Sequence, residues 1–437
     1  MKLWTFVSAR KLLVGSWFKV GKLERDNLIN SANSSELSPE KIRVLINLFN
    51  KGSFKAVILQ ADELISSFSQ SAVLFNIRAA AYAKLLKHDA AIKDYRNALK
   101  IKPDYAEAHN NLGNTFLLMN DLEAALDSYQ QAVTHKSDFA EAYNNIGNAL
   151  KKKGILDAAV ASYQRCLEIN PKFVDAYFNI GNVIKYLSFS EPNRKLSEII
   201  IKILGEKTFV RPTDLATSAI SLLKLEPAYQ DIWDKFLAGE LAHDLRQVAD
   251  DFSKLPLLLK LMPLSPLPDL EIEWLLTNLR SSILHDINSV EGSGALLKLQ
   301  CALALHCYTN DYIYVQPDED TNALESLEKN VVSHLEHGLQ PSPSELACLA
   351  SYKALNEYSW HHLVSFPNDL KELKKRHISD DQIEAVLRSK LPVLSGINDN
   401  ISTKVTKQYE EHPYPKWVNL SLPLRTSSVS EIAEALN

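Results

Sequence analysis

A pattern of hydrophobic and polar positions repeats three times in the first half of the chain. It reads YAEAHNNLGN, FAEAYNNIGN and FVDAYFNIGN, beginning at Tyr105, Phe139 and Phe173, so that successive copies start 34 residues apart. Within each copy the apolar positions recur at helical spacing, which predicts a helix that buries one face. A period of this length is typical of one helix–turn–helix block that stacks on copies of itself.

The copies also align, without gaps, at further positions. The equivalent residues are Tyr82, Phe116, Leu150 and Ile184; Ala91, Ala125 and Ala159; Tyr95, Tyr129 and Tyr163; and Ala98, Ala132 and Cys166. Small residues such as Gly113 and Gly147 predict that the first helix of a unit lies close to the second. Pro103 and Pro171 end two units because proline cannot continue the hydrogen-bond ladder of a helix. We therefore expect each copy to bury its apolar face only on its neighbours.

This set of recurring positions resembles the tetratricopeptide repeat (TPR). The resemblance covers about residues 37–189, as copies at 37–70, 71–104, 105–138 and 139–172 and a partial copy at 173–189. Two residues depart from the pattern: Arg78 stands where other copies carry Leu112 or Ile146, and His109 stands where an aromatic residue is usual. The resemblance implies an all-α fold, a solenoid in which helix–turn–helix repeats wind into a right-handed superhelix.

Beyond the repeats the helical pattern continues but the period is lost. Segments such as EIEWLLTNLRSSIL and ALLKLQCALALHCY carry apolar residues at i, i+3, i+4 and i+7, and prolines separate them. This predicts an irregular all-helical domain over residues 190–393. Residues 1–36 are interpreted as a leader and linker, and residues 394–437, rich in proline, serine and asparagine, as an extended connecting segment.

Composition narrows the class of protein. The 437 residues are 46% hydrophobic and 23% charged with only 13 glycines, which is typical of a soluble helical protein. The net charge of −5, without a basic block, argues against nucleic-acid binding. No stretch approaches the ~20 apolar residues that a membrane span requires. The four scattered cysteines suit a reducing compartment, so we expect a cytoplasmic protein.

Two columns of asparagines are the most informative polar residues. They are Asn111, Asn145 and Asn179, and, three residues further on, Asn114, Asn148 and Asn182. Spacing by three places both columns on one helix face. A column of amides can bind the backbone of an extended peptide whatever its sequence. Alternatively, the same amides cap turns or bond to neighbouring helices. The spacing also resembles the asparagine ladder in the TPR superhelix of O-GlcNAc transferase, and only the ladder positions carry over.

Catalytic and metal-binding motifs are weak by comparison. Gly292-Ser293-Gly294 follows a segment with a helical pattern and lacks the third glycine of a dinucleotide-binding loop, so it is interpreted as a helix connector. His334, His337 and the pair His361-His362 do not make a complete metal-ligand set. We therefore predict no metal, no cofactor and no catalytic residue in this chain. A helical enzyme that uses residues 290–362 is the least favoured alternative.

A late motif, QYEEHPYPKW at Gln408–Trp417, resembles the YEENPYPRW segment of a family of bacterial TPR-containing proteins. In that family an irregular helical region follows the repeats, and a class I S-adenosylmethionine-dependent methyltransferase domain follows the motif. The resemblance covers much of residues 209–417, with His412 in place of Asn and Lys416 in place of Arg. Because the chain ends at Asn437, where the cofactor-binding loop of that family would begin, we expect a fragment that does not bind S-adenosylmethionine.

The favoured hypothesis is a TPR scaffold that is not itself an enzyme. It would recognise an extended segment of a protein or peptide partner in its concave groove, through the six asparagines. The alternative hypothesis is the substrate-recognition portion of a methyltransferase whose catalytic domain lies beyond residue 437. The two are compatible, since recruitment by the repeats would be the first step of the second.

Overall fold

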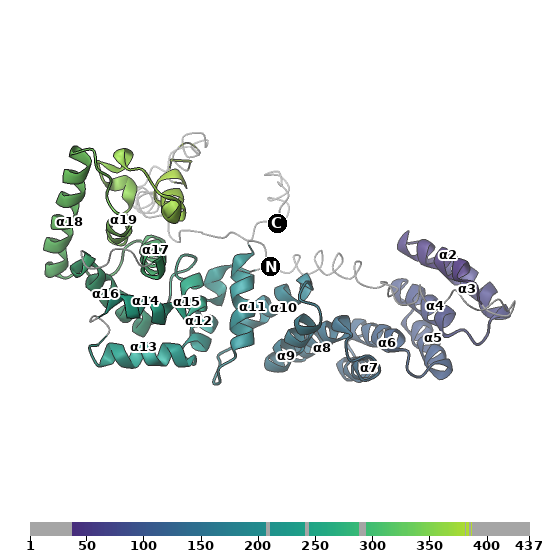
Figure 1. Ribbon diagram of the computed structural model, residues 1–437. Coiled ribbons are helices and arrows are strands. Elements are labelled where there is room, and N and C mark those ends of the chain that lie inside the picture. Colours follow the sequence, from purple (N-terminus) through teal and green to yellow (C-terminus); the bar gives the residue numbers. More distant parts are fainter. Residues whose placement is uncertain are drawn as a thin grey trace, which may run out of the picture. The chain divides into compact units, whose positions relative to one another are not determined.

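The computed structural model describes residues 37–206, 210–240, 244–287 and 294–380, together with 382, 383 and 386. Regular structure in these ranges is entirely helical (Figure 1). The chain divides into two compact units, with the boundary between Val183 and Ile184. The prediction of an all-α fold, a solenoid followed by an irregular helical region, is confirmed. None of the described helices is long and apolar enough to cross a membrane.

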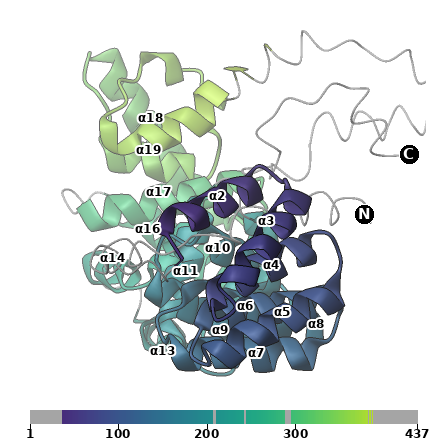
Figure 2. The same cartoon turned by 90° about the vertical axis from the view of Figure 1, so that its right-hand side faces the viewer.

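The first unit consists of helix pairs that follow one another in chain order (Figure 2, in which α2 and α3 are nearest the viewer). We refer to the members of each pair as the first and the second helix of a repeat. The pairs are α2 (Pro39–Asn50) with α3 (Phe54–Ser67), α4 (Ala72–Lys84) with α5 (His88–Ile101), α6 (Ala106–Leu118) with α7 (Leu122–His135) and α8 (Ala140–Lys153) with α9 (Leu156–Ile169), and α10 (Val174–Ile184) follows them.

The turn between the two helices of a repeat has the same backbone geometry in four copies. Gly52, Leu86, Asn120 and Gly154 stand 34 residues apart and have φ angles of 76°, 60°, 64° and 84°. In each turn the next residue donates its N–H to a carbonyl five residues earlier; the N–O distances are 3.0 Å for Ser53 to Leu48, 2.9 Å for Lys87 to Tyr82, and 3.0 Å for Asp121 to Phe116 and for Ile155 to Leu150. This is the left-handed cap that satisfies the last carbonyls of a helix. The least regular copy, residues 37–70, therefore forms the same turn as the others.

Glycines allow the two helices of a repeat to approach each other. A Cβ atom added to Gly113 would lie 2.7 Å from the ring of Tyr129, and one added to Gly147 would lie 2.5 Å from the ring of Tyr163. Real Cβ atoms do not approach other atoms so closely, and both tyrosines are fully buried. The close packing expected at these two glycines is confirmed.

Arg78, the first departure from the repeat pattern, forms a charged bridge between helices. Its Nε and Nη2 atoms lie 2.7 Å and 2.8 Å from the two carboxylate oxygens of Asp94 on α5, and its Nη1 lies 2.5 Å from Asp62 on α3. Burial alone would lower the pKa of Arg78, but the bonds to Asp94 and Asp62 raise it above its ordinary value. A buried charge is tolerated here because its partners pair with it in a two-pronged geometry.

His109, the second departure, keeps a contact that an aromatic residue makes in another copy. Its Nε2 atom lies 2.9 Å from the carbonyl oxygen of Pro103, which ends the preceding repeat. At the equivalent position the Tyr177 hydroxyl donates to the carbonyl of Pro171 at 3.0 Å. Histidine can therefore replace tyrosine here, because its ring nitrogen reaches the carbonyl that the tyrosine hydroxyl reaches in the other copy.

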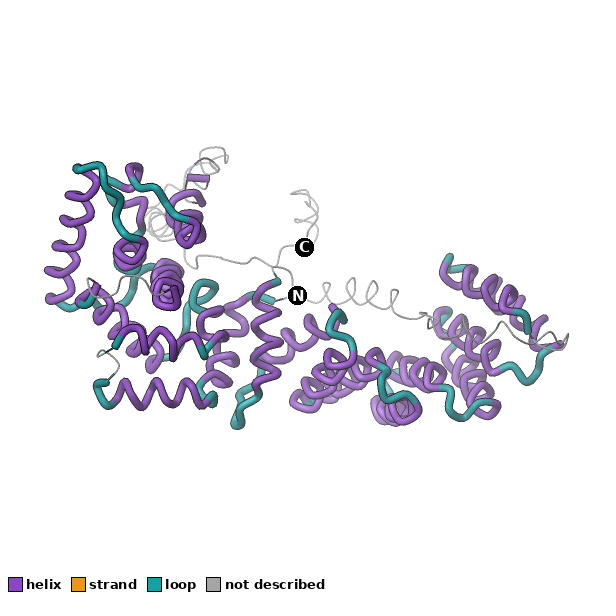
Figure 3. The backbone as a smooth tube through the Cα atoms, in the orientation of Figure 1, coloured by secondary structure: helices purple, strands orange, loops and turns teal. Residues whose placement is uncertain are grey.

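The second unit is a set of helices of unequal length (Figure 3). Prolines begin four of them, in the first turn, where a missing N–H costs nothing. The helices are α11 (Arg194–Gly205), α12 (Pro212–Leu223), α13 (Pro227–Leu237), α14 (Leu245–Ser253), α15 (Pro256–Leu261), α16 (Leu270–His285), α17 (Gly294–Thr309), α18 (Asp318–Glu336), α19 (Pro343–Ala350) and α20 (Lys371–Lys374), with 3-10 helices η3 (Leu355–Glu357), η4 (His361–Leu363) and η5 (Asn368–Leu370) and the π-helix η6 (Lys375–Ser379). The largely buried α17 packs against α14 and α19.

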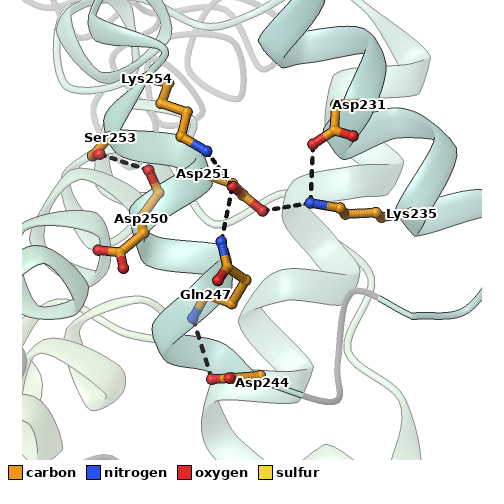
Figure 4. Close-up of polar contacts among 8 residues, drawn as sticks. All are labelled: Asp231, Lys235, Asp244, Gln247, Asp250, Asp251, Ser253 and Lys254. Carbon is orange, nitrogen blue, oxygen red and sulfur yellow. Dashed lines mark hydrogen bonds and ion pairs between the residues drawn. The ribbon is translucent and has the colours of Figure 1, made fainter.

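A buried carboxylate joins α13 to α14 in this unit (Figure 4). Asp251 accepts hydrogen bonds from Lys235 at 2.8 Å, Lys254 at 2.7 Å and Gln247 at 3.1 Å. The Nζ atom of Lys235 also forms an ion pair with Asp231, whose Oδ2 atom lies 2.9 Å away. Burial would raise the pKa of Asp251, but these donors hold it below its ordinary value. The arrangement is a structural ion-pair network.

Several predictions concern residues outside the described ranges. They are the leader and linker at 1–36, the connector at Gly292-Ser293, the motif at Gln408–Trp417 and the segment 394–437. These stay predictions.

Candidate functional site: the asparagine columns

The six predicted asparagines lie on the first helices of three successive repeats. Asn111 and Asn114 belong to α6, Asn145 and Asn148 to α8, and Asn179 and Asn182 to α10, all within the first unit. In each helix the two residues are three apart, so they share a face. We call Asn111, Asn145 and Asn179 the first column, and Asn114, Asn148 and Asn182 the second column.

The first column forms a ladder of hydrogen bonds between repeats. The Nδ2 atom of each member donates to the Oδ1 atom of an asparagine 35 residues earlier, on the first helix of the preceding repeat. The distances are 3.2 Å from Asn111 to Asn76, 2.9 Å from Asn145 to Asn110, and 3.1 Å from Asn179 to Asn144. The ladder therefore fixes how each repeat sits on the one before it.

The acceptor row of this ladder, Asn76, Asn110 and Asn144, was not predicted as functional. A signal for it exists in the sequence, because these residues recur every 34 positions and two of them directly precede a member of the first column. All three are buried, with Asn76 also donating to the Tyr105 hydroxyl at 3.2 Å. Their role is to hold the neighbouring amides in one orientation.

The second column is held within its own repeat. The hydroxyl of Tyr129 donates to Asn114 Oδ1 at 2.7 Å, and that of Tyr163 donates to Asn148 Oδ1 at 2.9 Å. Burial raises the pKa of both tyrosines, so each hydroxyl keeps its proton and remains a donor. Asn182 instead donates to the Phe178 carbonyl at 2.9 Å on its own helix.

Solvent access differs among the six residues. Asn111 is 6% exposed and Asn114 is 7% exposed, whereas Asn145, Asn148, Asn179 and Asn182 are half-buried. An asparagine side chain offers two N–H donors and a carbonyl oxygen with two lone pairs, and the ladder accounts for one donor of each member of the first column. The four half-buried amides therefore combine a fixed orientation with remaining hydrogen-bonding capacity.

The predicted histidines make local contacts in the second unit. His337 lies 2.8 Å from the Ser333 carbonyl, His361 lies 2.8 Å from the Tyr358 carbonyl, and His334 lies 4.0 Å from Glu345. Across the described part of the chain, no three His, Cys, Asp or Glu residues are grouped so that they could hold a metal ion.

The four cysteines are unpaired thiols. Burial raises the pKa of each of them to about 12. A thiol in such surroundings yields little thiolate near neutral pH, which does not favour a nucleophilic role.

Comparison with protein-family models decides the nature of the repeats. One model, described as TPR repeat, matches residues 79–120 and 113–154, and another, described as tetratricopeptide repeat, matches residues 140–173. These segments are tetratricopeptide repeats. The matched segments include Asn111, Asn114, Asn145 and Asn148, and Asn179 and Asn182 lie on α10, directly after them. We call the repeats together with α10 the TPR array. A comparison with curated proteins found no match.

Several solved structures are similar to this chain, and two of those given below are described as TPR proteins. A crystal structure of MamA shares 21% identity, covers 37% of this chain and 90% of that chain, and gives a TM-score of 0.31. YrrB, described as a TPR protein with an unusual peptide-binding site, shares 21% identity over 40% of this chain and 87% of that chain, with a TM-score of 0.31. TTC0263, a TPR protein from Thermus thermophilus, shares 19% identity over 33% of this chain and 79% of that chain, with a TM-score of 0.31.

The resemblance to methyltransferase-associated proteins depends on the motif at Gln408–Trp417, which lies outside the described residues. The upstream segments that share it, EIEWLLTNLR and LQCALALHCY, form parts of α16 and α17. The resemblance stays a prediction.

Proposed function

We propose that the TPR array binds an extended segment of a protein partner along the faces of α6, α8 and α10 that carry the asparagine columns. The supporting observation is the set of four half-buried amides, Asn145, Asn148, Asn179 and Asn182, repeated with a 34-residue period. An extended backbone presents N–H and C=O groups at regular intervals, and amides can pair with both. Such binding is tolerant of the sequence of the partner.

The hydrogen bonds within the array orient the asparagine side chains before any partner binds. Each amide of the first column is already oriented by its bond to the preceding repeat, and Asn148 by the hydroxyl of Tyr163. A side chain that is fixed before binding loses less entropy when the ligand arrives. Asn111, which is almost inaccessible, would hold its repeat on the preceding one, and the equally inaccessible Asn114 is bonded to Tyr129 within its own repeat.

The substitution Asn148→Asp should change peptide binding while it keeps the hydrogen bond that Asn148 makes within the fold. The substituted carboxylate keeps an oxygen that accepts from Tyr163, but it replaces the two N–H donors by a second acceptor. Peptides selected on the full chain from a random peptide library would be measured by calorimetry against the wild type and this variant. We expect affinity to fall roughly tenfold, because a hydrogen bond is lost and a carbonyl oxygen then faces a carboxylate.

Asn114→Asp is the matched control, since it keeps the same kind of bond with Tyr129 at a position closed to solvent. It should lower the thermal midpoint more than Asn148→Asp does and leave peptide affinity unchanged. If Asn148→Asp binds the selected peptides as tightly as the wild type, the second column is structural and the proposal is wrong.

A further inference from the structure

Three aromatic side chains gather on the surface of the second unit, where α13 meets α16. The ring centroids of Trp233 and Phe236 on α13 lie 5.3 Å apart, and Trp274 on α16 lies 6.0 Å from Trp233 and 4.8 Å from Phe236. Both contacts of Trp274 are edge-to-face, which is the favourable geometry for aromatic pairs. The cluster therefore has a defined shape.

Exposed leucines extend the cluster on both helices. Leu237 lies four residues after Trp233, and Leu270 lies four residues before Trp274, so each shares a helix face with its tryptophan. Trp274 is 54% exposed and Leu270 is 83% exposed. We call Trp233, Phe236, Leu237, Leu270 and Trp274 the aromatic patch. Trp233 and Phe236 are half-buried beside the exposed Trp274. Aromatic side chains grouped in this way are typical of the energetic centre of an interface.

Carboxylates dominate the charge of the two helices and of the turn before α16. They are Asp231, Asp234, Asp269, Glu271 and Glu273. Lys224 lies 2.6 Å from Asp269 and 2.7 Å from Glu271. Lys235 lies 2.9 Å from Asp231 and also bonds the buried Asp251. Because both lysines are already shared between two carboxylates, neither balances Asp234 or Glu273, and the surroundings of the patch are acidic.

We propose that the aromatic patch binds a basic segment of a protein partner, with an arginine guanidinium stacked on Trp274. Arginine is suited to this surface because its planar cation stacks on aromatic faces and pairs with carboxylates. Aliphatic side chains of the same segment would cover Leu237 and Leu270. The neighbouring acids, among them Asp234 and Glu271, supply the complementary charge.

The charge also argues against other occupants. An anionic lipid surface or an acidic peptide would meet carboxylates of the same sign. A second copy of this chain, docked through the same patch, would place two acidic rims against each other. The basic segment is the occupant for which both the rings and the charges are complementary.

A synthetic peptide of arginine, leucine and alanine, capped at both ends, is the probe. Its binding to the full chain would be followed by calorimetry and by tryptophan fluorescence. We expect saturable binding that weakens with added salt, and no binding of the same peptide with glutamate in place of arginine. Trp274→Ala should weaken binding about 5- to 30-fold, since a partly desolvated cation–π contact is lost. Leu339→Ala, which removes an exposed leucine that is not part of the patch, should not change it.

The double variant Asp234→Lys with Glu273→Lys reverses the charge and keeps the rings, so it tests the proposal if Trp274→Ala fails to fold, as judged by circular dichroism. It should weaken binding of the arginine peptide at least as much. Three results would overturn the proposal: equal affinity of the wild type and both variants, binding of vesicles containing phosphatidylglycerol that Trp274→Ala abolishes, or a dimer in sedimentation velocity that Trp274→Ala converts to monomer.

Discussion

Leu86 has a backbone conformation that leucine rarely adopts. Its φ of 60° matches those of Gly52, Asn120 and Gly154 at the equivalent turns, where glycine and asparagine tolerate the left-handed region. For a residue with a branched side chain the Cβ crowds the following carbonyl, at a cost of about 1–2 kcal/mol. The side chain is 72% exposed, so burial offsets little of this cost.

Leu86→Asn should therefore stabilise the array by about 1 kcal/mol, because the short polar side chain of asparagine can hydrogen-bond to the local backbone and so offset the crowding at the same φ. The measurement is the urea midpoint followed by circular dichroism. Asn120→Leu at the next turn is the reciprocal control and should destabilise by a similar amount. A lower midpoint for Leu86→Asn would mean that the leucine side chain has a stabilising contact that outweighs its strain.

Single positions also show where sequence reasoning stops. The 34-residue period identified Gly113, Gly147 and the two asparagine columns, because each is a recurring residue type. It did not identify that Asn145 bonds Asn110 in the preceding repeat. That pairing depends on the rotation between adjacent repeats, and a period in the sequence contains no information about that angle.

The two helices of a repeat face each other through an ion pair in one copy and through uncharged residues in the next two copies. In α4 and α5 the facing residues are Arg78 and Asp94, whereas the equivalent residues are Leu112 with Ser128 in the next repeat and Ile146 with Ser162 in the one after. Each serine hydroxyl there bonds a carbonyl of its own helix, so no charge needs a partner. The departure at Arg78 from the repeat pattern is thus matched by a second departure, Asp94 in place of serine.

Arg78→Leu alone should destabilise the array by about 3 kcal/mol, since it leaves the buried Asp94 without its cation. Arg78→Leu with Asp94→Ser, which copies the neighbouring repeat, should recover most of that loss. Chemical unfolding of both variants and of Asp94→Ser gives the coupling energy through a double-mutant cycle. Additive effects of the two substitutions would show that the bridge does not act as a unit.

At the same scale, helix boundaries in the second unit were partly predictable. Prolines such as Pro212 and Pro343 indicate breaks between helical patterns, and both begin helices. The network around Asp251 was not predictable, because its members come from separate helices and carry no recurring spacing.

The two units are stabilised in different ways. The TPR array relies on contacts between successive repeats and buries Asp94 in an ion pair, while the second unit buries a histidine. His306 is inaccessible, with Nδ1 3.0 Å from the Met262 carbonyl and Nε2 2.5 Å from the Tyr314 hydroxyl. A neutral ring satisfies both contacts, by donating from Nδ1 and accepting at Nε2. Burial lowers the pKa of His306 to about 4.

Acid should therefore destabilise the second unit over a defined range. An unfolded histidine binds a proton below pH ~6.5, while His306 in the folded chain stays neutral to about pH 4. As the pH falls, the histidine of the unfolded chain is protonated before that of the folded chain. The free energy of unfolding therefore keeps its full value above pH ~6.5 and decreases below it, by roughly 3 kcal/mol at pH 4. Urea midpoints between pH 7 and pH 4 would show this slope, and His306→Gln should flatten it. An unchanged slope in the variant would assign the acid sensitivity to other groups.

The asparagine ladder has a direction, and its two ends are marked in the sequence. Ile77 occupies the donor position at the start, and Phe178 occupies the acceptor position at the end, so the ladder has an initiating and a terminating residue. The copies between them each carry both an acceptor and a donor. Duplicating residues 105–138 would then lengthen the array by one repeat and the ladder by one hydrogen bond between asparagine side chains. The inserted copy would find a donor on one side and an acceptor on the other, and the residues at the two ends of the ladder would not change.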